Sequence, residues 1–203
     1  MELMDLQPYQ FLIQTEERDW VPFTSFVHRT FQGDDCLFFL HRLKEIYSTG
    51  GLEDMFSGCF QQTGNMAAAI SSFKQLFFEG EHLSRTEKHL PDPLKGSAAK
   101  RFNMFLRWMV RKDSQGVDFG IWTGIKPADL YCPLDVHSGN VARKLGLLIR
   151  KQNDWKAVEE LTGNLRQMDQ VDPVKYDIVL FSLGVNDFRL NPTISVLFRH
   201  DGR

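Results

Sequence analysis

Apolar residues recur along most of the chain at the spacing of a helix face. The clearest case lies between Asp34 and Tyr47, where apolar side chains stand three or four residues apart. Asp34 and Asp35 can cap the start of this helix. Gly50 and Gly51 can end it, because glycine reaches the left-handed backbone region without strain. The pattern therefore predicts a helix over about residues 34–47.

The same spacing continues through the rest of the chain, interrupted by two segments rich in turn-forming residues. It predicts helices over about 52–60, 65–79, 97–112, 154–168 and 172–183, and one from Asp135 or Ser138 to about Arg150. The segments 81–95 and 117–132 are expected to be irregular. No clear run alternates apolar and polar residues as a strand would, so the predicted fold class is all-α.

The composition is that of a globular protein from a reducing compartment. The 203 residues are 42% hydrophobic and 25% charged, which argues against a disordered or fibrous chain. Cys36, Cys59 and Cys132 lie far apart, which excludes a disulfide framework and a four-cysteine iron–sulfur cluster. The chain starts without a basic leader, and its longest charge-free run, residues 55–73, is interrupted by polar residues. We therefore expect a cytoplasmic protein with no membrane partner.

The formal net charge of −2 conceals one strongly basic segment. Residues 94–151 carry 11 basic and 4 acidic side chains, whereas residues 1–93 carry 7 basic and 14 acidic ones. Such asymmetry is typical of a surface that binds a polyanion, for example a nucleic acid. It also fits a solvated face that acidic neighbours balance in the folded protein. The charge pattern leaves both interpretations open.

Four polar residues of the predicted helix 97–112 fall on one stripe. Lys100, Asn103, Arg107 and Arg111 follow one another at steps of three, four and four. A row of cations with one amide is suited to contacts with phosphates. An ordinary solvent-exposed helix face would show the same pattern.

A block in the second half of the chain resembles a family signature. It reads Cys-Pro-Leu-Asp-Val-His over 132–137 and Val-Ala-Arg-Lys-Leu-Gly-Leu over 141–147. This is similar to the P-V-D-x-H…V-x-R-L-G-L signature of the helix-hairpin-helix DNA glycosylase superfamily, which includes endonuclease III-like enzymes and 8-oxoguanine DNA glycosylases. Two more blocks resemble motifs of that superfamily and occur in the same order along the chain. Residues 96–100 stand where it has G-V-G-x-K, and residues 176–184 resemble its L…H-x-x-L-I-x-F-G helix.

The resemblance covers about residues 85–187 and departs from the family at the hairpin. Of the glycines in the usual L-P-G-V-G turn only Gly96 remains, and Lys100 and Asp135 are 35 residues apart, a longer gap than most members have. The archaeal 8-oxoguanine glycosylases are similar in both respects. The whole chain looks most like an uncharacterised bacterial family in which K-R-x-N-M-F-L-R-W-M-V-R and P-L-D-V-H-S-G-x-V-A-R-K-L-G-L recur together. Because members of that family begin earlier, we expect this chain to lack an N-terminal segment.

The resemblance implies that Lys100 is the nucleophile of base excision and that Asp135 is its electrostatic partner. An amine attacks the anomeric carbon, and a carboxylate stabilises the positive charge that builds on the sugar. The alternatives are that Lys100 is a surface lysine on a phosphate and that Asp135 is only the N-cap of the next helix. Both roles of Asp135 are compatible, because a helix N-terminus fixes a carboxylate and keeps it ionised.

Extruding a damaged nucleotide also needs cations on the DNA backbone and apolar groups in the stack. In that family the histidine two residues after the catalytic aspartate contacts a phosphate. His137 stands at this position, although it can equally be a residue of the first helical turn without a special role. The predicted nucleic-acid contacts are Asn103, Arg107, Arg111, His137 and Arg143. Aromatic side chains more often belong to a core, but the predicted stacking or wedge residues are Trp108 and Trp122.

The expected architecture is an all-α, helix-hairpin-helix glycosylase-like domain with an atypical hairpin. Residues 1–93 would form an N-terminal helical lobe, residues 94–187 the glycosylase-like core and residues 188–203 a tail, together making one compact domain. No cofactor is expected, because the histidines lack metal-ligand spacing and no Walker A or GxGxxG motif is present.

The expected function is excision of bases from damaged duplex DNA, with associated abasic-site lyase activity. Oxidised purines are the substrate class that the resemblance suggests. The alternative is a non-catalytic module that binds nucleic acid through the same scaffold. A helical scaffold protein without a nucleic-acid role is a third possibility.

Overall fold

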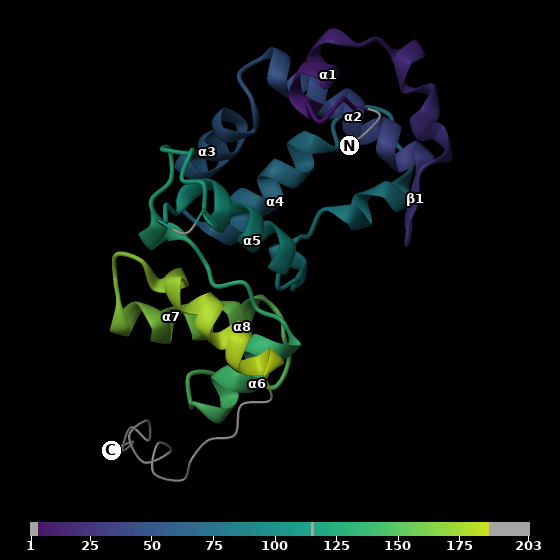
Figure 1. Cartoon of the computed structure of the whole chain (residues 1–203). Coiled ribbons are helices and arrows are strands. Elements are labelled where there is room, and N and C mark those ends of the chain that lie inside the picture. Colours follow the sequence, from purple (N-terminus) through teal and green to yellow (C-terminus); the bar gives the residue numbers. More distant parts are fainter. Residues whose placement is uncertain (1–3, 115, 187–203) are drawn as a thin grey trace.

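The computed structural model describes residues 4–114 and 116–186, which are mostly helical (Figure 1). The predicted all-α class is confirmed. The predicted tail, residues 188–203, lies outside the described residues. No helix within the described ranges is long and apolar enough to cross a membrane.

The first part of the chain is helical apart from one short hairpin that the sequence pattern did not predict. Its strands pair Val27 with Gln32 and His28 with Phe31. The elements are α1 (Pro8–Gln14), the 3₁₀ helix η2 (Glu17–Ser25), β1 (Val27–His28), β2 (Phe31–Gln32), α2 (Gly33–Ser48), α3 (Leu52–Thr63) and α4 (Met66–Phe77).

The second part alternates α-helices with short 3₁₀ turns. Between α5 and α6 the chain is largely irregular, as predicted. The elements are η3 (Ser84–His89), η4 (Pro93–Lys95), α5 (Lys100–Val110), η5 (Pro127–Asp129), α6 (Val136–Lys144), α7 (Trp155–Met168), η6 (Pro173–Tyr176) and α8 (Asp177–Val185).

Local sequence explains where these helices begin and end. Gly50 and Gly51 have φ angles of 139° and 126°, which separates α2 from α3 at the predicted place. Asp154 caps α7 by accepting a hydrogen bond of 3.1 Å from the Ala157 N–H. The helix predicted to reach Arg150 instead ends at Lys144, because Gly146 adopts a φ of 73° and terminates it.

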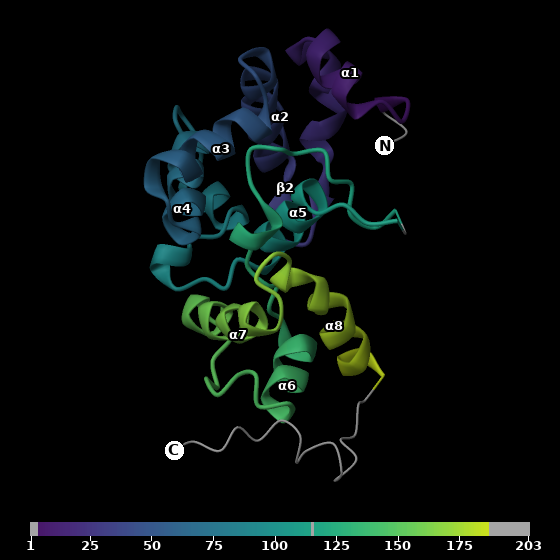
Figure 2. The same ribbon diagram turned by 90° about the vertical axis from the view of Figure 1, so that its left-hand side faces the viewer.

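The helices form two groups on either side of α5. Figures 1 and 2 show α1–α4 on one side and α6–α8 on the other. The main hydrophobic core contains residues from both groups, including Phe56 of α3, Ile70 of α4, Leu106 of α5 and Leu161 of α7. A smaller cluster around Trp20 supports α1 and η2 against α2. Helix α5 therefore lies where the two groups meet.

Helix α8 packs closely on the start of α6 at Gly184. A Cβ atom on Gly184 would lie 2.7 Å from the His137 carbonyl oxygen, which is closer than real Cβ contacts come. The glycine thus lets two backbones approach where a side chain would separate them.

We expect Gly184→Ala to lower the free energy of unfolding by about 1–3 kcal/mol, because the added methyl group overpacks the α6–α8 contact. The control is Gly163→Ala in α7, where a Cβ meets nothing within 4 Å. That substitution is expected to raise stability by about 0.5–1 kcal/mol through helix propensity. Chemical denaturation of the two variants measures both effects. Equal stabilisation by both substitutions would contradict the close approach.

Candidate active site

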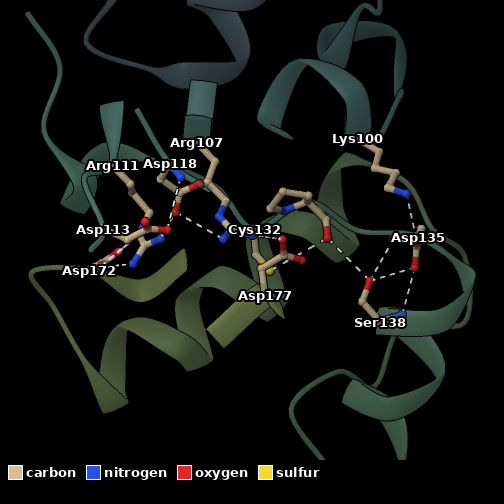
Figure 3. A network of polar contacts seen from close by, with 11 residues as sticks. Lys100, Arg107, Arg111, Asp113, Asp118, Cys132, Asp135, Ser138, Asp172 and Asp177 are labelled. Atoms are coloured by element: carbon tan, nitrogen blue, oxygen red, sulfur yellow. Dashed lines mark hydrogen bonds and ion pairs between the residues drawn. The ribbon is translucent and has the colours of Figure 1, made fainter. Parts of the chain in front are cut away.

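Lys100 and Asp135 meet at the junction of α5 and α6. Lys100 is the first residue of α5 and Asp135 is the N-cap of α6, and the Lys100 Nζ lies 2.7 Å from the Asp135 Oδ2 (Figure 3). The lysine side chain is 40% exposed and the aspartate side chain 15%. The fold therefore brings together the two residues for which the sequence predicted catalytic roles, although their chemistry stays a prediction.

Both carboxylate oxygens of Asp135 are engaged, each in a different role. The Oδ1 accepts hydrogen bonds of 2.9 Å from the Ser138 N–H and 3.1 Å from the Ser138 hydroxyl, which caps α6. The Oδ2 accepts from Lys100. The cap thus fixes the carboxylate at the junction, and its role as N-cap coexists with the ion pair.

The pKa of Asp135 lies below its ordinary value of 3.8. Partial burial raises this pKa, but the hydrogen bond from Lys100 and those from Ser138 lower it by more. Asp135 is therefore an anion at neutral pH. It is suited to stabilising positive charge rather than to accepting a proton.

The turn before Lys100 has two residues with positive φ angles, Gly96 and Ala99. Gly96 has a φ of 90°, and its carbonyl accepts a hydrogen bond of 3.2 Å from the Trp155 N–H at the start of α7. Ala99 has a φ of 47°, a left-handed conformation that costs a residue with a Cβ about 1–2 kcal/mol. A non-glycine residue held in this region beside a candidate site is consistent with a functional constraint on the direction of Lys100.

The ring of Phe181 lies near the ion pair, and the His137 ring contacts that of Phe181. The Lys100 Nζ lies 5.9 Å from the centre of the Phe181 ring of α8, and the His137 ring packs edge-on against Phe181 with centres 6.2 Å apart. His137 and Phe181 are both exposed. His137 contacts Phe181, and the role predicted for it at a phosphate stays a prediction.

The predicted cationic stripe on α5 is wrong for its three later members. Asn103 is 1% exposed and donates a hydrogen bond of 3.2 Å to the Ala98 carbonyl. Arg107 is 2% exposed and Arg111 is 9% exposed. The helical spacing that places them on one side is present, but this side faces carboxylates of the protein instead of solvent.

Arg107 and Arg111 join α5 to later parts of the chain through three aspartates, a set we call the Arg107 network (Figure 3). Arg107 donates to Asp177 at 2.6 Å and to Asp118 at 3.2 Å. Arg111 donates to Asp118 and, at 2.7 Å, to Asp172. Because the guanidinium groups are engaged inside the protein, these arginines are not available to phosphates.

The pKa of the buried Asp177 depends on charges of both the Arg107 network and the candidate site. Burial raises its pKa above the ordinary value, and this outweighs the lowering effect of Arg107. The Asp135 carboxylate also raises the pKa of Asp177 and the Lys100 ammonium lowers it, so the charges of the two clusters influence each other.

The remaining predicted residues have structural contacts. Arg143 donates to the Arg150 and Lys151 carbonyls, and at 2.6 Å to the Asn153 side chain. Asn153 in turn donates to the Asp135 carbonyl at 3.1 Å, so Arg143 braces the loop that supports Asp135. A nucleic-acid contact by Arg143 stays a prediction.

The two predicted stacking residues differ in accessibility. Trp122 is buried, with its ring centre 5.4 Å from that of Phe105, so its predicted exposure to DNA is wrong. Trp108 is 39% exposed, and its carbonyl accepts the Phe119 N–H. Its role in stacking remains a prediction.

Sequence reasoning missed Ser138, Asp177 and Phe181. Ser138 carried a signal, because a serine three residues after an aspartate at a helix start fits a reciprocal cap. Asp177 and Phe181 lie in the block 176–184 that resembles a family helix, but no role was predicted for either, since only the packing of α8 brings them to α5 and α6. Within the described ranges no cluster of three or more His, Cys, Asp or Glu side chains is arranged to hold a metal ion.

Comparison with known proteins gives one match. The model of a protein family described as protein of unknown function (DUF2400) matches residues 1–186. No curated protein and no solved structure matches the chain.

Arg107→Met is expected to lower the free energy of unfolding by about 3–5 kcal/mol, because it leaves Asp177 buried without its partner. The control is Arg101→Met on the same helix, which removes an exposed guanidinium and should change stability by less than about 0.5 kcal/mol. Urea denaturation gives both values. A loss for Arg107→Met as small as the control's would refute the buried network.

Asp135→Ala is expected to lower stability at pH 7 by about 0.5–2 kcal/mol through loss of the cap. The folded pKa of Asp135 is depressed, so its contribution is present above the unfolded value and is lost as the pH falls through the folded value. The difference between wild type and variant should therefore shrink below pH 3.8. Denaturation at several pH values tests this, and a difference that does not change with pH would contradict it.

Proposed function

This chain belongs to the DUF2400 family of proteins of unknown function, and we propose that it is a DNA base-excision glycosylase with abasic-site lyase activity. The observation that carries the proposal is the pairing of Lys100 and Asp135 at 2.7 Å across the α5–α6 junction. The resemblance to the glycosylase superfamily implies catalytic roles for these two residues. Their contact in the fold, across 35 residues of sequence, supports the proposal.

The proposed reaction uses each group for one task. The Lys100 ammonium first gives up a proton to water, and the resulting amine forms a bond to C1′ as the bond from C1′ to the base breaks. The base leaves with the bonding electrons and takes a proton from water. The bonded nitrogen then loses a proton to water. The bond from C1′ to the ring oxygen breaks and that oxygen takes up a proton, so the sugar ring opens and a Schiff base forms. Removal of a proton from C2′ finally expels the 3′ phosphate, which is the lyase step.

Asp135 would stabilise the positive charge on the sugar during base loss. Its lowered pKa keeps it ionised, and its cap contacts hold it still, so little reorganisation is needed as charge develops. The substrate must displace the Lys100 ammonium from the Oδ2 so that the sugar can lie between the two groups. We propose damaged duplex DNA as the partner, oxidised purines as the lesion class and the cytoplasm as the location.

A non-catalytic nucleic-acid-binding module is the second candidate. It is favoured by the fact that Lys100 is held in an ion pair, because a partly exposed pair of this kind also occurs as a purely structural contact. In that case His137, Lys100 and exposed cations such as Arg101 would hold DNA or RNA without chemistry. The burial of Arg107 and Arg111 removes two of the contacts on which this candidate relied.

Borohydride trapping separates the two candidates. Wild-type protein incubated with abasic-site DNA and reduced should form a covalent adduct, because the reagent fixes the Schiff base. Lys100→Ala should abolish the adduct. The matched control is Lys95→Ala, which removes an exposed lysine five residues earlier and should leave the adduct unchanged.

Three other results would count against the proposal in different ways. Binding without an adduct, weakening steeply with salt, would favour the non-catalytic module. An adduct that survives Lys100→Ala would show that another amine is the nucleophile. Absence of both binding and adduct would favour a scaffold protein.

A further inference from the structure

Five phenylalanine rings line a pocket between α2, α4 and α5, away from the candidate site. The rings belong to Phe39 of α2, Phe73 and Phe77 of α4, and Phe102 and Phe105 of α5. We call this cavity of about 220 Å³ the phenylalanine pocket. Its two α5 rings follow Lys100 by two and five residues, which places them on the opposite side of the helix. The pocket is therefore distinct from the site of the proposed reaction.

The aromatic wall of the pocket is fixed by its own packing. Successive ring centres lie 4.9 Å (Phe39 to Phe77), 5.9 Å (Phe77 to Phe73), 5.3 Å (Phe73 to Phe102) and 6.3 Å (Phe102 to Phe105) apart. These separations fall within the range of about 4.5–7 Å in which aromatic rings attract one another. Phe73, Phe77 and Phe102 are also buried in the main core. The pocket is thus preformed, and a ligand that enters it pays little for ordering the protein.

The size of the pocket limits the ligand to a small apolar body. An apolar cavity of about 150 Å³ in a protein takes up benzene, which has six carbon atoms. On this scale the phenylalanine pocket holds an apolar group of about six to nine carbons. An aromatic ring with a short chain, or a short alkyl chain, meets this limit. Its transfer from water to the phenylalanine rings is favourable.

The charged side chains at the pocket are basic. Among the described residues that line it, His89 and Arg101 can carry charge, and no carboxylate is present. The His89 Nε2 lies 3.5 Å from an oxygen of the buried Asp35, so a charge on this imidazole is balanced within the protein. Arg101 is exposed and forms no ion pair with the carboxylates of residues 4–114 and 116–186. It also stands in the first turn of α5, where the helix dipole disfavours a cation. The folded chain therefore leaves the positive charge of Arg101 unmatched.

We infer that the phenylalanine pocket binds a small carboxylic acid whose apolar body has about six to nine carbons. The rings hold the apolar body, and the guanidinium of Arg101 pairs with the carboxylate. A guanidinium suits this partner, because its planar N–H groups match the two oxygens of a carboxylate. The inference goes beyond the proposed function, since it concerns other residues and a ligand that is not a nucleic acid.

The experiment uses the full chain and three probes with the same alkyl chain. Octanoate is an anion, octanol is neutral and octylammonium is a cation. Isothermal titration calorimetry should show octanoate binding about two- to fivefold more tightly than octanol, the effect of one solvent-exposed ion pair. Octylammonium should bind more weakly than octanol, because its charge is repelled by Arg101.

Three variants test which residues are responsible. Arg101→Gln should reduce the affinity for octanoate to that for octanol and leave the affinity for octanol unchanged. The matched control, Lys95→Gln, removes one positive charge from an exposed lysine outside the pocket and should keep the preference for octanoate. Leu90→Trp fills the pocket from its lining and should abolish binding of both probes. Circular dichroism checks that each variant is folded.

The place of binding is measured on wild type and needs no variant. Nuclear Overhauser effects from the octanoate methyl group should reach the ring protons of Phe73 and Phe77, which line the pocket. Absence of binding, equal affinity of wild type for octanoate and octanol, a preference that survives Arg101→Gln, or contacts only with other apolar residues would overturn the inference. Failure to form a borohydride adduct with DNA would overturn the proposed function alone, because the pocket uses neither Lys100 nor Asp135.

Discussion

The buried guanidinium of Arg107 is the interaction on which the arrangement of the second half of the chain depends. It lies between Asp118 and Asp177, and so holds α5, the segment that follows it and the start of α8 in fixed relation. A charge without a partner is very costly inside a protein, so conformations that separate these elements are disfavoured. Lys100 at the start of α5 and Phe181 on α8 owe their relative positions to this contact.

Helix positions were predictable because they depend on local signals. Glycines after α2 and an aspartate before α7 end and begin helices through their own backbone and side-chain chemistry. The hairpin at residues 27–32 gave no such signal, because two residues a strand are too short to show a pattern. The end of α6 was predicted wrongly because apolar residues continue on both sides of Gly146, whose φ of 73° ends the helix.

The environment of the charged residues could not be predicted, because spacing fixes a helix face but not what covers it. Arg107 meets a carboxylate 70 residues later and Arg111 one 61 residues later. No local pattern distinguishes such partners from solvent. Lys100 and Asp135 were identified only through the resemblance to a family. The role of Ser138 in the cap could be recognised from a short motif. The position of Phe181 could not, because it depends wholly on how α8 packs.

The two carboxylate oxygens of Asp135 have different partners, and this affects which ligands can bind at the site. In the free protein the Lys100 ammonium pairs with the Asp135 Oδ2 and offsets the charge of the carboxylate, whose side chain is 15% exposed. A ligand can bind the Asp135 Oδ2 only if it replaces the Lys100 ammonium and is compatible with Ser138, which stays bound to the Oδ1. The backbone need not move for this exchange, because the capping oxygen stays where it is. Release of the Oδ2 would therefore require only the Lys100 side chain to swing away from it.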